Sequence, residues 1–436
     1  MTFRFRRKKK TEWLVLFALI MPFTFFVLIN LLRVPSLIKY TIDIAWVLML
    51  MSMLYDYRTM PNRESQKLLT IVLVFWLATL IGTAINYQSV LYYLWGFRNN
   101  MRFYVFFFAC IFYLREESIA HYYRFLDVVF WINLLMSLFQ FFVLGLRQDY
   151  LGGIFGVEKG CNAYTNILLV IICAGTILKY MNGQEKFWNS FLKCGAALAI
   201  AALAELKVFI VELVIVIAAA SLMTKFSLRK LWIMLCIGFC GIVAIQVLVF
   251  LSPHFAGWFN LQSMWETATS DSGYTMSNDM NRLTAFSISL NRFLLKGSEK
   301  LFGLGLGNCD YSTAFTFLAT PFYLQNRLLH YTWFSSAFLL LETGIVGLCL
   351  YLLFFVAVFI NAGKRGRTGK ANIVYCQMAQ IMSIIGCLMV IYNSSLRIEA
   401  AYMLFFVLAV PFVNNGRDRT VSAAMKLPER RKVSKL

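Results

Sequence analysis

The stretch from Leu328 to Leu350 reads LLHYTWFSSAFLLLETGIVGLCL. Its length and its apolar character predict a helix that crosses a membrane, since about 20 such residues span the hydrocarbon core of a bilayer. The same stretch contains a histidine, His330, and a glutamate, Glu342. A carboxylate at the centre of a membrane helix costs about 2.5–3.5 kcal/mol on insertion scales. Glu342 therefore needs a protein partner or a polar cavity, which the rest of the chain has to supply.

The composition of the whole chain favours the same class of protein. Of its 436 residues, 60% are hydrophobic and 14% are charged, and its mean hydropathy is +0.68. Soluble domains average about 45–50% apolar and about 25% charged residues. Apolar runs of roughly 17–25 residues predict an all-α, polytopic integral membrane protein with about twelve transmembrane helices. The predicted spans are Trp13–Leu32, Leu37–Tyr55, Leu68–Ile85, Met101–Leu114, Phe125–Leu146, Tyr164–Met181, Phe191–Ala204, Val208–Met223, Leu231–Leu251, Tyr331–Ile360, Ile373–Tyr392 and Ile398–Val413.

The positions of lysine and arginine predict the orientation. The N-terminal sequence MTFRFRRKKK precedes the first span, and the loops assigned to the cytoplasm hold most of the other lysines and arginines. We therefore expect both termini in the cytoplasm. The chain then divides into a first set of spans (1–251), a large external loop (252–330), a last set of spans (331–413) and a basic cytoplasmic tail (414–436). The net charge of +20 follows from this bias and from a tail that lies on anionic lipid, so it requires no nucleic acid.

The short cytoplasmic loops exclude ATP-driven transport by this chain alone. None is long enough for a nucleotide-binding domain, and the sequence has no GxxxxGK[ST] motif. A lipid flippase is expected to carry charged residues at the centre of many spans, whereas the polar groups here lie toward the predicted outer face. The pattern favours an enzyme over a transporter.

The external loop contains a second helical pattern. From Met280 to Leu294, apolar residues recur at a spacing of three to four, which predicts an amphipathic helix on the outer membrane surface. Its N-terminal cap is expected near Ser277 or Asn278. Arg282 would project from this helix close to the membrane surface.

Two further features place possible anion-binding groups on the external side. The run LFGLGLGN contains Gly303, Gly305 and Gly307, whose backbone amides can approach an anionic ligand closely. The turn AELK between two spans carries Glu205 and Lys207. For this turn the alternative is a Glu205–Lys207 pair that caps it without any ligand.

Each of the other polar groups also has a simpler interpretation. His330 is then a solvated residue at the membrane surface, and Arg282 is a solvated arginine of a loop. Glu342 is then held in a structural ion pair with an arginine or lysine of a neighbouring helix, where Gly344 and Gly347 allow close packing.

The cysteines leave one question of pairing open. Most of the ten cysteines fall inside predicted spans, where they behave as small apolar side chains. Cys161 and Cys309 fall on the external side, either as two unpaired thiols or as a disulfide.

Together these segments resemble the O-antigen ligase and polysaccharide polymerase superfamily of integral membrane glycosyltransferases. The resemblance rests on the ordered segments GGIFG…NAYTN, NRLTAFSISLNRFLL, LFGLGLGNCDYS and HYTWFSSAFLLLETGIVGLCLYL. In that family an arginine-headed helix leads to a Gly-x-Gly turn, and a later histidine opens a span that carries Glu-x-Gly-x-x-Gly. The matching positions are Arg282, Gly303, Gly305, Gly307, His330, Glu342, Gly344 and Gly347. The resemblance implies a GT-C-like fold with one large external loop containing amphipathic helices.

The resemblance also implies a chemistry, in which a sugar chain moves from a polyprenyl diphosphate to a hydroxyl of another lipid-linked sugar. Arg282 would bind the diphosphate, with Lys207, Gly303 and Gly305 completing the binding site. His330 would be the general base, because imidazole titrates near neutral pH. The supporting residues would be Glu342, Gly344 and Glu205. No cofactor and no metal are implied.

These expectations favour a membrane polymerase that joins lipid-linked oligosaccharide repeats into exopolysaccharide, capsule or O-antigen at the outer face of a bacterial cytoplasmic membrane. The alternatives are an O-antigen ligase that transfers the glycan to a final acceptor and, behind it, a lipid-linked oligosaccharide flippase. The expected partners are an undecaprenyl-diphosphate-linked oligosaccharide, the lipid bilayer, and a chain-length regulator and a flippase of the same pathway.

Overall fold

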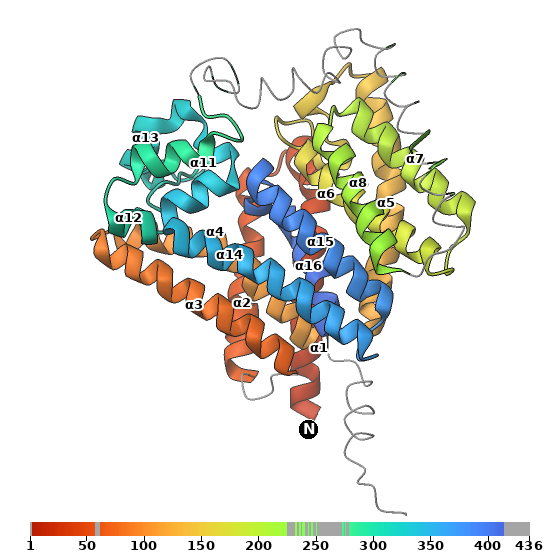
Figure 1. Cartoon of the computed structure of the whole chain (residues 1–436), viewed down its shortest axis with the longest axis horizontal. Helices are drawn as coiled ribbons and strands as arrows, with labels where there is room; N and C mark the ends of the chain where they lie inside the picture. Colours follow the sequence, from red (N-terminus) through yellow and green to blue (C-terminus); the bar gives the residue numbers. More distant parts are fainter. Residues whose placement is uncertain are drawn as a thin grey trace, which may run out of the picture.

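The computed structural model describes residues 2–56, 62–224 and 279–413 without interruption, together with isolated positions between 232 and 275. Among these residues the secondary structure is entirely helical, with no strand (Figure 1). Most of the predicted span Leu231–Leu251 lies outside the described residues, as do the cap near Ser277 or Asn278 and the basic tail 414–436.

The helices fall into long ones that build the body and short ones that connect them. The long helices are α1 (Thr2–Phe25), α2 (Thr41–Asp56), α3 (Arg63–Ile85), α4 (Val90–Tyr113), α5 (Glu116–Phe142), α6 (Asn162–Met181), α7 (Phe187–Leu203), α8 (Lys207–Met223), α14 (Ser335–Arg367), α15 (Ile373–Tyr392) and α16 (Ala401–Ala409). The short helices are α11 (Ala285–Ile288), α12 (Gly297–Phe302) and α13 (Pro321–Asn326), and the π-helical segments are η1 (Phe26–Leu31) and η7 (Ser289–Phe293). The 3-10 turns are η2 (Ser36–Tyr40), η4 (Gln148–Tyr150), η5 (Gly153–Phe155), η8 (Thr316–Leu318), η9 (Arg327–Leu329), η10 (Tyr331–Trp333), η11 (Ser395–Arg397) and η12 (Val410–Phe412).

The long helices confirm the membrane class of the chain. Each predicted span that falls on described residues coincides with a helix. Within the described part of the chain, 7 helices are long and apolar enough to cross a membrane, and the apolar segments Phe187–Leu203 and Ala401–Phe412 are shorter. The protein is a helical membrane protein, and the expected number of about twelve spans stays a prediction.

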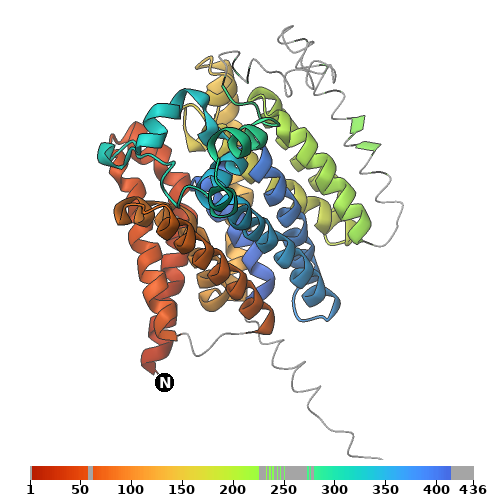
Figure 2. The ribbon, with the colours of Figure 1, turned by 60° about the vertical axis from the view of Figure 1, so that its left-hand side comes forward.

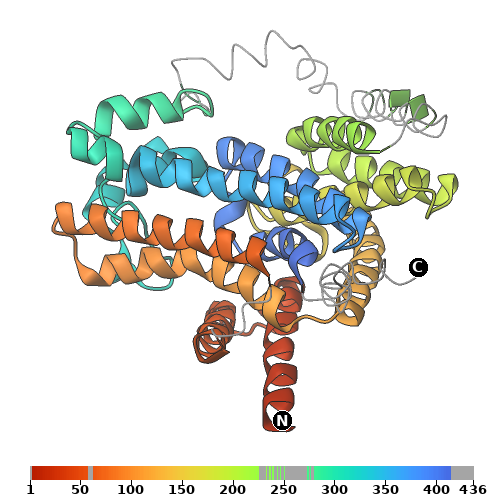
Figure 3. The same ribbon diagram turned by 60° about the horizontal axis from the view of Figure 1, so that its bottom comes forward.

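The helices α14 and α15 occupy the centre of the bundle. α14 packs against α3 and α15, and α15 also contacts α6, α8 and α16. Figure 3 shows this order, with α3 and α4 (orange) on one side of α14 (blue) and α7 and α8 (yellow-green) on the other. Every residue of α16 is buried, as expected for a helix that is apolar all round and has protein on every side.

The described part of the segment 252–330 forms a group of short helices at one end of the bundle. α11, α12 and α13 lie there, and α12 packs on α3 and α14 (Figure 1). The N-terminal end of α1 lies at the opposite end of the molecule (Figure 2). This arrangement separates the loop segments from the N-terminus by the length of the bundle.

The structure corrects the predicted amphipathic helix Met280–Leu294. The helix begins only at Ala285 and continues through α11 into η7, and Arg282 lies in the turn ahead of it. In this turn the Asn281 side chain accepts a hydrogen bond from the amide of Arg282 at 2.7 Å, and the Asn281 amide donates to the hydroxyl of Thr284 at 3.3 Å. Such side-chain hydrogen bonds compete with helical ones, and the apolar periodicity does not reveal them.

Candidate functional site

His330 lies at a sharp turn where the loop 252–330 leads into α14. Its backbone is in the left-handed region with φ 53°, between η9 and η10. The imidazole stacks on the indole of Trp333, with ring centroids 4.0 Å apart. Its Nδ1 lies 3.2 Å from Oδ2 of Asp279, and 32% of the His330 side chain is exposed. The ring is therefore held on one face and at one nitrogen, yet it remains accessible.

Asp279 is the carboxylate that meets His330, and the sequence analysis did not single it out. Its side chain is fully buried, and its two oxygens accept hydrogen bonds from the amide and the hydroxyl of Thr275, each at 2.9 Å. Burial alone would raise the pKa of Asp279, but the bonds from Thr275 and the nearby His330 outweigh it and lower the pKa. No sequence signal distinguished this acid from an ordinary solvated one, because its partner lies far along the chain.

Arg282 and Lys207 are brought close to each other from separate parts of the chain. The guanidinium of Arg282 lies over the ring of Tyr392, with Cζ 3.9 Å from the ring centroid. Lys207 is the first residue of α8, ahead of its apolar segment. Burial and then the charge of Arg282 lower the pKa of Lys207, while Glu205 acts in the opposite direction. Lys207 and Arg282 thus form one cationic region. Two neighbouring positive charges suit an anion with more than one charge.

Glu205 forms the turn that presents Lys207. Its backbone has φ 54°, and its carbonyl accepts a hydrogen bond from the amide of Lys207 at 2.9 Å. Burial raises the pKa of Glu205, partly offset by a hydrogen bond from the side chain of Gln148 and by the charge of Lys207. The turn is therefore tied to the loop that precedes α6, and Glu205 lies beside Lys207 without removing it from the neighbourhood of Arg282.

The glycine run packs against the transmembrane helices. A Cβ on Gly303 would lie 2.5 Å from the backbone of Glu342, and a Cβ on Gly344 would lie 2.4 Å from the carbonyl of Leu301. Both glycines have positive φ, and Gly344 interrupts the helical geometry of α14. The amide of Gly303 donates to the carbonyl of Glu299 at 2.7 Å. Gly303 and Gly344 thus allow the loop and α14 to meet backbone to backbone, and the Gly303 amide is already occupied.

Gly305 and Gly307 make similar close approaches to other elements. Gly305 faces the side chain of Gln88, whose amide nitrogen donates to the carbonyl of Leu306 at 2.7 Å. Gly307 lies against the backbone of Tyr92 and Gly96 in α4. These contacts give the glycines a packing role, and the predicted contact of Gly305 with a diphosphate stays a prediction.

Glu342 is completely buried in α14, and its partner is a backbone group. Its Oε1 accepts a hydrogen bond from the amide of Cys309 at 3.3 Å. Within the described residues no ion pair of Glu342 is found, so the alternative of a structural pair with a lysine or arginine has no support there. Arg397, whose charge also acts on Glu342, instead pairs with Asp310 at 3.3 Å. Asp310 in turn accepts a hydrogen bond from the side-chain Nδ2 of Asn99 at 2.6 Å, which ties the loop to α4.

A third cation, in the loop before α6, lies near the ring on which His330 stacks. Lys159 is exposed, and its Nζ lies 5.5 Å from the ring centroid of Trp333, the residue on which His330 stacks. The resemblance drew on the neighbouring segments GGIFG and NAYTN but did not select this lysine. The only available signal was its position in the segment GVEKGCN, which is common in solvated loops.

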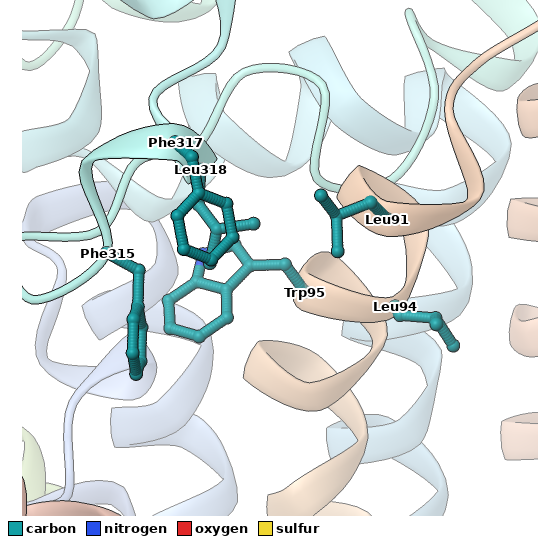
Figure 4. Close-up of a pocket in the computed structure, with 6 residues that line it drawn as sticks. All are labelled: Leu91, Leu94, Trp95, Phe315, Phe317 and Leu318. Carbon is teal, nitrogen blue, oxygen red and sulfur yellow. The ribbon is translucent and has the colours of Figure 1, made fainter.

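An apolar pocket of about 280 Å³ lies between the first turns of α4 and the segment around η8. Figure 4 shows the side chains that line it. They are Leu91, Leu94, Trp95, Phe315, Phe317 and Leu318. Because this lining offers almost no polar atoms, the pocket is unsuited to a diphosphate, and neither His330 nor Arg282 belongs to it.

Two open questions of the sequence concern thiols and metal ligands. Cys161 and Cys309 are both buried and both free, so the disulfide interpretation is wrong and the unpaired interpretation is confirmed. Within the described residues, no group of three or more histidine, cysteine, aspartate and glutamate side chains is placed to hold a metal ion.

The comparisons with known proteins add no relative. No protein-family model matches the chain, and no curated protein matches it at a significant level. The functional interpretation therefore depends on the site geometry and on the motif order.

Proposed function

We propose that the protein is a membrane polymerase that joins polyprenyl-diphosphate-linked oligosaccharide repeats into exopolysaccharide, capsule or O-antigen. One relationship carries the proposal. The segment that contains Asp279 and Arg282 runs beside the segment that ends at His330, since the amide of Met280 donates to the carbonyl of Leu329 at 3.0 Å. A candidate base and a candidate diphosphate ligand therefore lie on neighbouring segments of one loop, with Lys207 close to Arg282.

The proposed reaction is a glycosyl transfer in one displacement. The hydroxyl oxygen of the acceptor sugar attacks the anomeric carbon of the donor and forms the new glycosidic bond. The bond between that carbon and the diphosphate oxygen breaks, and the electron pair leaves with the diphosphate. Arg282 and Lys207 stabilise the negative charge of the leaving group. His330 takes the hydroxyl proton at Nε2 as the attack proceeds.

The kinds of residue in this region also favour an enzyme over a transporter. Diphosphate is a good leaving group, so the site needs positive charge more than a strong acid. Arg282 and His330 lie in the loop that precedes α14, and Lys207 is the first residue of α8, so none of the three lies at the centre of a long helix. We place this region on the outer face of a bacterial cytoplasmic membrane, with both termini in the cytoplasm, as the positive-inside rule indicates.

The proposed partners follow from the substrate class. The donor and the acceptor are undecaprenyl-diphosphate-linked oligosaccharides dissolved in the bilayer, delivered by a flippase, and a chain-length regulator acts on the product. An O-antigen ligase shares the donor and the chemistry and differs in the acceptor. Analysis of the product separates the two, because a polymerase makes a ladder of repeats on the lipid carrier and a ligase moves a finished chain to another molecule.

The test is complementation of a strain that lacks the gene. His330→Ala, His330→Gln and Arg282→Ala should each abolish the polymer on a gel while the protein level in the membrane stays normal. Removal of a general base typically costs about 10²–10⁴ in rate. His121→Gln is the matched control, because His121 is exposed on α5. An active His330→Gln variant would remove the base from the proposal, since glutamine cannot take up a proton.

A further inference from the structure

We propose that Asp279 is the positioning residue of His330: its carboxylate accepts the Nδ1–H of the imidazole and leaves Nε2 unprotonated toward the acceptor sugar. This inference rests on the proposed function, because it names the group that orients the base of that reaction. It adds a residue that carries no part of the motif resemblance.

Two contacts restrict the ring of His330 in different directions. Asp279 Oδ2 lies 3.2 Å from Nδ1, so the carboxylate fixes one edge of the imidazole. The indole of Trp333 stacks on one face, with an angle of 15° between the two planes. The ring can therefore neither turn about its axis nor tilt without losing one of these contacts. The side chain remains 32% exposed, and Nε2 is the ring nitrogen that the contact with Asp279 leaves open.

The carboxylate itself is held firmly enough to act as an orienting group. Its side chain is completely buried, and Thr275 donates to it through both its amide and its hydroxyl. Gly273 comes so close that a Cβ there would lie 2.2 Å from the carbonyl of Asp279. Gly273 and Thr275 thus both lie against Asp279, and Oδ2 is held in front of His330.

The chemistry of imidazole explains why this matters. A neutral histidine has one protonated and one free nitrogen, and only the free nitrogen accepts a proton. An acceptor at Nδ1 selects the tautomer with the proton on Nδ1, and its negative charge stabilises the imidazolium that forms during the reaction. A histidine in the other tautomer presents a donor to the sugar hydroxyl and cannot act as its base.

The direct test reads the tautomer of His330 by nitrogen-15 NMR of the full-length protein in nanodiscs, with labelled histidine. The chain has only 3 histidines, so spectra of His121→Gln, His254→Gln and His330→Gln assign each signal. We expect neutral His330 to carry its proton on Nδ1 in the wild-type protein and to shift toward the Nε2–H form in Asp279→Ala. A wild-type His330 protonated on Nε2, or a tautomer that does not respond to Asp279→Ala, overturns the inference.

The second arm measures polymer and separates this inference from the proposed function. Asp279→Asn should lower the rate about 10²-fold or more, Asp279→Glu should restore part of it, and the exposed Glu158→Gln should have no effect. If His330→Gln stays active while the tautomer depends on Asp279, the role of His330 as the base fails and the orienting contact stands. If neither the wild-type protein nor any variant restores polymer to the strain that lacks the gene, the proposed function fails. If His330→Gln is inactive and Asp279→Asn is fully active, the inference fails and the proposed function stands.

Discussion

The buried carboxylate of Glu342 accepts a hydrogen bond from the amide of Cys309, with Oε1 and N 3.3 Å apart. A polar side chain inside a transmembrane helix thus holds the backbone of the loop 252–330. The bond joins α14 to the loop segment that directly follows Gly307. Glu342, whose burial in hydrocarbon costs free energy, therefore anchors the loop to α14.

The first prediction concerns this anchor. Glu342→Gln should be tolerated well, because the glutamine carbonyl can accept the same hydrogen bond from Cys309. Glu342→Leu should destabilise the protein by about 1–3 kcal/mol, because a buried amide then has no acceptor. The measurement is the thermal midpoint of the purified protein in detergent together with its abundance in the membrane. Equal losses in the two variants would show that the charge of Glu342, and not its acceptor oxygen, is what the fold requires.

The location of the spans could be predicted from the sequence, whereas the partners of the polar groups could not. A membrane-spanning helix consists of about 20 consecutive apolar residues, so a short stretch of sequence is enough to predict α6 or α15. The partner of Glu342 is a backbone amide, which any residue provides. The acid at Asp279 meets His330 across 51 positions, and no local pattern encodes that contact. The turn at Arg282 was missed for a related reason, because single side-chain hydrogen bonds break a helix that periodicity predicts.

The second prediction concerns the contact between Gly303 and Gly344. Gly303→Ala and Gly344→Ala should each lower stability by about 1–3 kcal/mol, because both positions combine positive φ with a backbone neighbour. Gly297→Ala is the matched control, since a Cβ there has nothing within 4 Å. Protein abundance and thermal midpoint are compared with polymer output. A Gly303→Ala protein of normal abundance that makes no polymer would instead favour the predicted contact with the diphosphate.

The third prediction concerns orientation in the membrane. A reporter fused after Lys370, which lies between α14 and α15, should be cytoplasmic, and so should one fused after Lys426. A reporter fused after Ser270 should be external, because the positive-inside rule places that loop outside. Paired reporters that are active on opposite sides of the membrane give the answer. A cytoplasmic Ser270 fusion would place the cationic region on the wrong side for an externally presented donor.

The fourth prediction concerns Lys159 and its contact with Trp333. An exposed cation–π contact contributes about 0.5–1 kcal/mol, so Lys159→Ala should lower kcat/KM for the donor only about 2- to 5-fold. The effect should be on KM, because Lys159 touches neither His330 nor Asp279. The exposed Lys186→Ala, in the connection between α6 and α7, serves as the control. A loss of kcat with unchanged KM would contradict this role and place Lys159 among the groups that act on the reaction itself.

The last prediction concerns the charge of Lys207 and its dependence on pH. Burial and the charge of Arg282 lower the pKa of Lys207, so the lysine loses its proton at a lower pH than the ordinary value of about 10.4. Below the lowered pKa Lys207 is charged and binds the diphosphate of the proposed donor. As the pH rises through that pKa the charge is lost, and KM for the donor should increase.

Two variants separate charge from shape at this position. Lys207→Ala should raise KM about 10- to 100-fold at neutral pH, because a hydrogen bond to a charged group contributes about 1.5–3 kcal/mol. Lys207→Arg should keep much of the activity and remove the alkaline rise in KM, since arginine stays protonated throughout that range. The measurement is the initial rate with purified lipid-linked oligosaccharide between neutral and alkaline pH. If Lys207→Ala makes glycan of normal amount and length, Lys207 belongs to the turn with Glu205 and Arg282 holds the diphosphate without it.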